Sequence, residues 1–201
     1  MAKLAMNKSS LNRERKKLET YERFLPSLEM KRRQLTALRN RAREDHQRWR
    51  ERLEREVADV GHRLPMLASD QFDLSGMVRL ERVDLGWENA VGLRLPVLEG
   101  VVDHVEPYSY LAEPHWVDNA VDALRAALRL RVQVEIATRR LHILEEGVRK
   151  ITQRVNLFQE VLIPQTRENI RRIGVYLGDA ERAAVIRAKF AKSKRAKRAS
   201  A

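Results

Sequence analysis

Cysteine is absent from this 201-residue chain, so neither a disulfide nor a thiolate metal site can form within it. Glycine (8 residues), proline (6) and aromatic residues (5%) are scarce, which is atypical of β-sandwiches and barrels. No stretch approaches the roughly 18 consecutive apolar residues of a membrane-spanning helix, and the first residues lack the continuous apolar core of a signal peptide. These absences predict a soluble chain that is rich in helix.

Charged residues are abundant and unevenly distributed. They make up 34% of the chain beside 43% hydrophobic residues, and the formal net charge is +12. Residues 1–60 carry a net charge of +7, residues 61–116 carry −5 and residues 117–201 carry +10. The change of sign predicts two basic arms that flank an acidic middle section.

An apolar seam with the period of a coiled coil runs through the second arm. Its residues recur at alternating steps of four and three, over more than four heptads: Leu130, Val134, Ala137, Leu141, Leu144, Val148, Ile151, Val155, Phe158 and Leu162. From Phe158 the steps to Leu162, Thr166 and Ile170 are all four, a stutter that locally unwinds a supercoil. Because a proline removes one helical hydrogen bond and bends the axis, we predict a bend of this helix at Pro164.

The first arm carries a matching but less regular seam. Leucines recur there every seven residues, first as Leu11, Leu18 and Leu25, and then, three positions later, as Leu28 and Leu35. Its other faces carry acidic and basic residues four positions apart, an arrangement that supports long exposed helices. Two such helices need each other, because each has an apolar stripe to bury.

Between the arms the pattern changes to partial two-residue alternation. The segments "MVRLERVDLGW" and "VGLRLPVLEGVVDHV" predict two β-strands, with the turn between them at Glu88 and Asn89. The predicted fold is mainly α: a long antiparallel two-helix coiled coil with a short β-hairpin insert at the bend. The predicted divisions are an N-terminal long helix (1–68), a hairpin with its connecting segment (69–112), a C-terminal long helix (113–190) and a basic tail (191–201).

Motifs of known catalytic sites do not occur in the sequence. It has no glycine-rich phosphate loop, no "HExxH" and no "GxSxG", and its five histidines lack the spacing of metal ligands. We therefore predict no catalytic residue, no metal site, no cofactor and no enzymatic activity for the isolated chain. Residues 182–201 hold eight Lys/Arg and no acid, but Phe190 is their only aromatic residue for base stacking. The tail is either a solvated chain end or a binding segment, and as a binding segment it favours docking on an acidic protein surface over nucleic-acid binding.

The two arms resemble a known family. The segment "ITQRVNLFQEVLIPQTRENIRRIGVYL", followed by "ERAAVIRAKFAK", is similar to the C-terminal helix of the D subunit of the V-type (archaeal and bacterial A/V-type) rotary ATPases. More weakly, "LNRERKKLETYERFLPSLEMKRRQL" resembles the N-terminal helix of bacterial members, and "GDAERAAV" has fewer charges than the family pattern. The residues that match the C-terminal pattern are Arg154, Val155, Asn156, Ile163, Pro164, Ile170, Ile173 and Leu177.

The resemblance implies a central rotor shaft, which couples ATP hydrolysis or synthesis in a catalytic head to ion translocation through a membrane rotor. The implied partners are the catalytic and non-catalytic head subunits (A and B), the F subunit and a membrane-side rotor adaptor, at the cytoplasmic face of the membrane. Without the resemblance, the residues leave open a basic coiled-coil scaffold that binds nucleic acid or acidic partners. Basic residues near both chain ends are candidates for contacts with the head: Lys8, Arg13, Arg171, Arg172, Arg182, Arg187 and Lys189.

Overall fold

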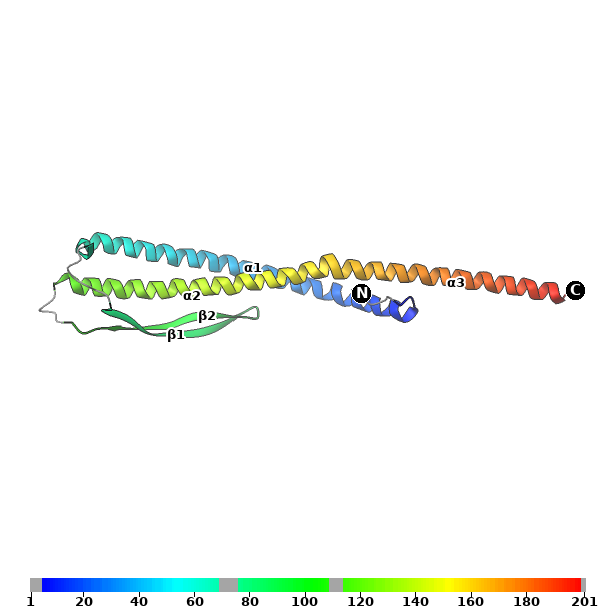
Figure 1. Ribbon diagram of the computed structural model, residues 1–201, viewed down its shortest axis with the longest axis horizontal. Helices are drawn as coiled ribbons and strands as arrows, with labels where there is room; N and C mark the ends of the chain where they lie inside the picture. Colours follow the sequence, from blue (N-terminus) through cyan, green and yellow to red (C-terminus); the bar gives the residue numbers. More distant parts are fainter. Residues whose placement is uncertain (1–4, 69–75, 109–113, 200–201) are drawn as a thin grey trace. The chain divides into compact units, whose positions relative to one another are not determined.

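The computed structural model describes residues 5–68, 76–108 and 114–199, with side chains described up to residue 66, within 76–108 and from 114 to 195 (Figure 1). The helices and strands follow one another as α1 (Lys8–Arg63), the short 3-10 helix η1 (Pro65–Ala68), β1 (Val78–Ala90), β2 (Leu93–Val105), α2 (Trp116–Asn156), the π-helix η2 (Leu157–Leu162) and α3 (Ile163–Ala199). The predicted fold class is therefore confirmed: two long helical arms are separated by a two-stranded antiparallel hairpin.

Helix α1 begins where the sequence provides a cap. The side-chain oxygen of Asn7 accepts a hydrogen bond from the backbone N–H of Ser10 at 2.7 Å, which satisfies one of the free donors of the first helical turn. Arg63 lies in the last turn of the helix, where its positive charge is beside the negative end of the helix dipole.

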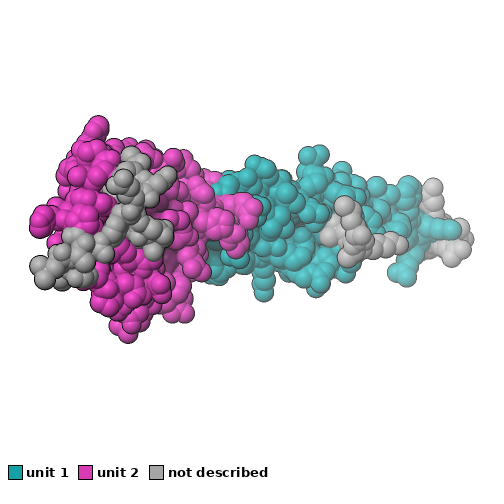
Figure 2. All heavy atoms as spheres, turned by 60° about the vertical axis from the view of Figure 1, so that its left-hand side comes forward, with its two compact units in different colours: residues 1–30, 151–201 teal, residues 31–150 magenta. Residues whose placement is uncertain are grey.

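The chain forms two compact units, which Figure 2 shows in different colours. Unit 1 comprises residues 1–30 and 151–201, and unit 2 comprises residues 31–150. In unit 1 the two arms run antiparallel. Gln159 of η2 donates a hydrogen bond to Glu29 of α1. Later in the chain, Arg167 of α3 pairs at 2.7 Å with Glu22, which comes before Glu29 in α1. In unit 2, α1 and α2 lie side by side, and Arg43 pairs with Glu145 at 2.9 Å.

In unit 2 the hairpin packs against the helices through both apolar and polar contacts. Leu95 of β2 and Leu144 of α2 are almost completely buried. Arg140 of α2 donates hydrogen bonds to the carbonyl oxygen of Pro96 at 2.9 Å and to Glu88 at 3.1 Å. A Cβ atom at Gly147 would lie 2.5 Å from Cδ1 of Leu93, so the hairpin occupies the space that a side chain at residue 147 would need.

The hairpin turn lies three residues later than predicted from the sequence. Glu88 and Asn89 belong to β1, where they pair with Leu95 and Arg94, and the turn is a two-residue loop of Val91 and Gly92. Both turn residues have positive φ (54° and 80°), as in the mirror-image turns that suit the twist of hairpins. The Asn89 side chain, which lies in β1 and not in the turn, accepts a hydrogen bond from the Gly92 N–H at 3.0 Å and so stabilises the turn.

Replacing Val91 with Asn should stabilise the hairpin by about 1 kcal/mol, because the left-handed conformation is unfavourable for a β-branched residue and acceptable for Asn. We expect hydrogen exchange of the β1 and β2 amides to slow about fivefold. Val91→Ala is the control, since alanine keeps most of the steric penalty. Equal exchange rates in the two variants would show that strain at Val91 is not the cause.

Candidate interaction surfaces

The structure buries the predicted seam to different extents. Leu35, Leu144, Ile151 and Val155 are buried, with at most 4% of each side chain exposed. Ala137 is also buried, at 7%. The other predicted seam residues are half-buried: Leu11, Leu18, Leu25, Leu28, Leu130, Val134, Leu141, Val148, Phe158 and Leu162. In unit 1 the ring of Phe158 meets Tyr21 of α1 edge to face, with the ring centroids 5.4 Å apart.

The change of seam phase near Pro164 has a different geometry from the predicted stutter. Residues Leu157–Leu162 form a π-helix, and the backbone N–H of Ile163 donates to the carbonyl oxygen of Phe158, five residues back. The extra residue moves Ile163 into the buried position that the stutter assigned to Leu162. The seam then resumes with steps of three and four through Thr166, Ile170 and Ile173.

Two prolines stand near this π-helix in unit 1. Pro164 is exposed and is the second residue of α3. Pro26 lies inside α1, three residues before Glu29, which accepts a hydrogen bond from Gln159 of the π-helix. The π-helix is therefore hydrogen-bonded to α1 within one turn of Pro26. No irregularity was predicted at Pro26, although a proline within a helical pattern is itself a signal of a bend or break in the helix.

The predicted head-contact residues are exposed, and all of them belong to unit 1. Within the described part of the chain, Arg182 is the member of this set that forms an ion pair, with Asp179 at 3.2 Å. Arg13 lies at the same level of the helix pair as Arg171 and Arg172, because its neighbour Glu14 accepts a hydrogen bond from Asn169 at 3.2 Å. Uncompensated positive charge on this surface attracts acidic groups.

Glu14 is a buried acid in the seam of α1, only 5% exposed. Burial acts to raise its pKa, but hydrogen bonds from Lys17 and Asn169 and the charges of Lys17 and Arg13 together lower the pKa below its ordinary value. Glu14 is thus a charged group at neutral pH that ties α1 to α3. The sequence did not predict this contact, because an acidic residue between Leu11 and Leu18 indicates an interruption of the apolar seam.

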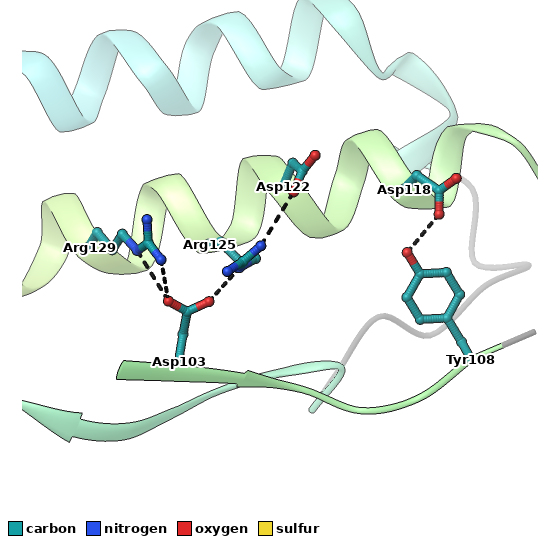
Figure 3. A network of polar contacts seen from close by, with 6 residues as sticks. All are labelled: Asp103, Tyr108, Asp118, Asp122, Arg125 and Arg129. Atoms are coloured by element: carbon teal, nitrogen blue, oxygen red, sulfur yellow. Dashed lines mark hydrogen bonds and ion pairs between the residues drawn. The ribbon is translucent and has the colours of Figure 1, made fainter. Parts of the chain in front are cut away.

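A polar network attaches the hairpin to α2, and sequence analysis missed it too (Figure 3). The Asp103 side chain of β2 is 2% exposed and accepts hydrogen bonds from Arg125 and from Arg129, the latter at 2.6 Å. These hydrogen bonds hold the pKa of Asp103 below its ordinary value, and the same contact raises the pKa of Arg125. Nearby, the Tyr108 hydroxyl donates to Asp118 at 2.6 Å. Two features of the sequence could have indicated this network: an acidic residue, Asp103, in an apolar strand, and two arginines, Arg125 and Arg129, one helical turn apart.

In residues 5–68, 76–108 and 114–199, no helix is long and apolar enough to cross a membrane. The part of the chain that the structure describes also has no group of three or more His, Cys, Asp or Glu side chains placed to hold a metal ion.

The fold and these surfaces define a coiled-coil protein with a hairpin insert, whose exposed charge lies along paired helices. The family of the ATP synthase D subunit matches residues 10–193, and the chain belongs to that family. It is 28% identical over 200 residues to the V-type ATP synthase D subunit of Borreliella burgdorferi, covering 96% of this chain and 95% of that protein. It is 31% identical to the protein of the same name from Chlamydia pneumoniae, covering 94% and 91%. The chain is thus a subunit of a rotary ATPase.

Proposed function

We propose that this chain is the central rotor shaft of a rotary V-type ATPase, a subunit that transmits torque and has no catalytic site of its own. Family membership along nearly the whole chain is the observation that carries the proposal. In this role the shaft couples ATP hydrolysis or synthesis in the head to ion translocation through the membrane rotor.

The contacts between the helices support a role in transmitting torque. A shaft must resist bending and twisting, and a single helix of this length is flexible. Within unit 1 the pair is held by buried Val155 and Ile173, by Glu14 with Asn169, and by the ion pair of Glu22 with Arg167. Each exposed ion pair contributes little, so most of the stiffness comes from the buried seam.

The exposed basic residues of unit 1 suit a bearing surface. A rotor must pass several equivalent positions of the head without a deep energy minimum at any of them. Separate exposed charges meet this requirement, because each contact is weak and screened by salt. We infer that these residues contact the A and B subunits of the head collectively: Lys8, Arg13, Arg171, Arg172, Arg182, Arg187 and Lys189.

The partners follow from the same role. We expect the F subunit along the shaft, a membrane-side rotor adaptor at the hairpin end, and a peripheral location on the cytoplasmic side of the membrane. The acidic middle section, 61–116, is our candidate for docking on the membrane-side rotor or for regulation.

Purification of the native complex through a tag on this chain tests the proposed function. We expect a nucleotide-binding hexamer and small helical subunits in fixed stoichiometry, with ATPase activity that the isolated chain lacks. Recovery of the tagged chain with nucleic acid and without the hexamer would instead support a basic scaffold.

Replacing Pro164 with Ala tests the predicted bend of the shaft. Alanine restores the missing backbone N–H and removes the ring, so the helix is expected to straighten. The reconstituted complex should then pump fewer ions per ATP hydrolysed, measured in vesicles. The control is Gln165→Ala, an exposed neighbour that leaves the proline in place. Unchanged coupling in Pro164→Ala would contradict a functional bend.

A further inference from the structure

The π-helix η2 stands between two contacts that fix α1 to the second arm within unit 1. At its start, the ring of Phe158 meets the ring of Tyr21, with the centroids 5.4 Å apart. Beyond its end, the buried side chain of Thr166 is followed by Arg167, which pairs with Glu22 of α1 at 2.7 Å. Phe158 and Thr166 therefore both lie on the side of this arm that faces α1.

A regular α-helix cannot place both residues on that side. Thr166 follows Phe158 by eight residues. Each residue turns an α-helix by about 100°, so eight residues make two turns and leave an excess of about 80°. In η2 the N–H of Ile163 donates to the carbonyl oxygen of Phe158, five residues back, and this wider turn holds one more residue than an α-turn. The π-helix thus absorbs a mismatch of phase between the two arms.

The same mismatch has a second solution without a π-helix. In the stutter of the heptad pattern, Leu162 follows Phe158 by four residues and Thr166 follows Leu162 by four. A stutter is accommodated by unwinding the supercoil over the neighbouring turns. The residue that faces α1 is then Leu162, whereas in the π-helix it is Ile163, which is 7% exposed. The two solutions differ in whether the excess rotation is held in one turn or spread along the pair.

The side chains do not strongly favour either solution. Leucine and isoleucine are isomers of equal apolar size, so the space beside α1 accepts Leu162 or Ile163 at similar cost. Every residue of η2 is exposed or half-buried, and Leu157 and Val161 are 46% and 48% exposed, so its outer side can turn without breaking buried contacts. Pro164 has no backbone N–H, so one hydrogen bond fewer has to change its acceptor.

Helix α1 is interrupted at the same level of the pair. Gln159 of η2 donates a hydrogen bond to Glu29, which lies within one turn of Pro26 in α1. A proline removes a backbone hydrogen bond and lets the helix axis bend. Both helices of unit 1 are therefore weakened at the level of η2, and this is where the pair resists twisting least.

We propose that η2 is a torsional joint, in which Leu162 and Ile163 exchange as the residue that faces α1. Torque that unwinds the pair favours the stutter with Leu162, and torque that overwinds the pair retains the π-helix with Ile163. The contacts on either side of η2, made by Phe158 and Arg167, remain in place during the exchange. The inference rests on the proposed function in one respect, that the chain carries torque.

Deletion of Val161 removes the additional residue and the joint with it. The present Ile163 then follows Phe158 by four residues, and the residues that face α1 recur at alternating steps of four and three, as in a regular coiled coil. Residues beyond η2 keep their partners on α1, so the isolated chain should unfold at an unchanged or higher temperature. The control is Val161→Ala, which loses most of the same side chain and keeps the additional residue.

Thiol labelling measures the exchange in the isolated chain, which has no cysteine of its own. The thiol of Ile163→Cys is covered in the π-helix and is exposed whenever Leu162 takes its place. We expect deletion of Val161 to slow its labelling by a maleimide about tenfold, and Val161→Ala to leave the rate unchanged. Ile173→Cys, at a buried position beyond the joint, should label at the same rate in all three backgrounds. An unchanged rate for Ile163→Cys after the deletion would overturn the proposal.

A second variant keeps the length of the chain and serves where the deletion prevents folding. Leu162→Asn penalises the state in which residue 162 faces α1, because an amide would be buried there. It should slow the labelling of Ile163→Cys as the deletion does. The matched control is Leu157→Asn, on the exposed side of the same π-helix. Labelling as fast as in the control variant would contradict an exchange between Leu162 and Ile163.

Twisting the shaft within the assembled complex measures the response to torque. The head is fixed to a surface, catalysis is stopped with a non-hydrolysable ATP analogue, and a magnetic bead turns the membrane-side end of the shaft in either sense. For the same torque we expect the wild-type shaft to turn about twice as far in the sense that unwinds the pair. Deletion of Val161 should make the two responses equal. Equal responses in the wild type would overturn the proposal, because a simply elastic shaft gives that result.

Failure of the joint is distinguishable from failure of the proposed function. If the wild-type chain does not assemble with the hexamer, the proposed function fails. If the wild-type complex rotates during ATP hydrolysis but neither the labelling nor the twisting depends on the additional residue of η2, the proposed function stands and the torsional joint is overturned.

Discussion

Asp103→Asn is expected to loosen the hairpin from α2 by about 2 kcal/mol, the contribution of hydrogen bonds to a charged group. The carboxylate is 2% exposed, whereas Arg125 and Arg129 are 38% and 53% exposed and can turn to solvent once it is neutralised. The effect is therefore smaller than for a fully buried ion pair. Hydrogen exchange of the β2 amides should accelerate roughly thirtyfold, since 1.4 kcal/mol corresponds to a factor of ten.

The matched control is Asp84→Asn, on the same hairpin. Asp84 pairs with Arg82 at 2.9 Å, but its side chain is 42% exposed, so the change should be below about 1 kcal/mol. Equal acceleration in the two variants would show that the Asp103 network does not attach the hairpin.

The pH dependence of the Asp103 effect has a definite sign. The folded protein lowers the pKa of Asp103 below its ordinary value of 3.8. Its stabilising contribution is thus complete above that pH and is lost as the pH falls through the lowered folded-state pKa. The difference in thermal stability between wild type and Asp103→Asn should remain constant at neutral pH and shrink in strong acid.

Leu144→Ala is expected to destabilise unit 2 by about 2 to 5 kcal/mol, the usual cost of truncating a buried leucine. Leu144 is 2% exposed and lines a cavity of about 380 Å³ between α1, β2 and α2, so the truncation enlarges a space that already exists. Denaturant unfolding followed by circular dichroism measures the change. Because the chain has two units, the hydrogen exchange of residues 31–63 and 116–150 shows whether the loss is confined to unit 2.

Val57→Ala serves as the control for Leu144→Ala. Val57 is also a helical residue of unit 2, but it is 57% exposed, so its truncation should change stability by less than about 0.5 kcal/mol. A loss as large as that of Leu144→Ala would mean that exposure in the isolated chain does not reflect the packing of this helix.

Local patterns in the sequence were sufficient to predict the long elements. The heptad series through Leu144, Ile151 and Val155 predicted a long helix, because apolar spacing is a property of consecutive residues and needs no knowledge of the partner. Two-residue alternation predicted the hairpin in the same way. The motif of Arg154, Val155, Asn156, Ile163 and Pro164 indicated the family.

Features that depend on contacts between distant residues could not be predicted from the sequence. The turn at Val91 and Gly92 follows from which residues of β1 and β2 pair, and its positive φ at a valine runs against local preference. The π-helix depends on which of Leu162 and Ile163 meets α1. The first is decided by the pairing of the strands and the second by packing against α1, not by local preference.

By itself the sequence determined that this protein is a pair of long basic helices joined through an acidic hairpin, since periodicity and charge are written residue by residue. Only the tertiary structure decided that Asp103 meets Arg125 and Arg129, that Glu14 meets Asn169, and that a groove remains between the hairpin and the helices. These features join residues from 22 to 155 positions apart. Their energies exist only after the chain has folded, so no local pattern encodes them.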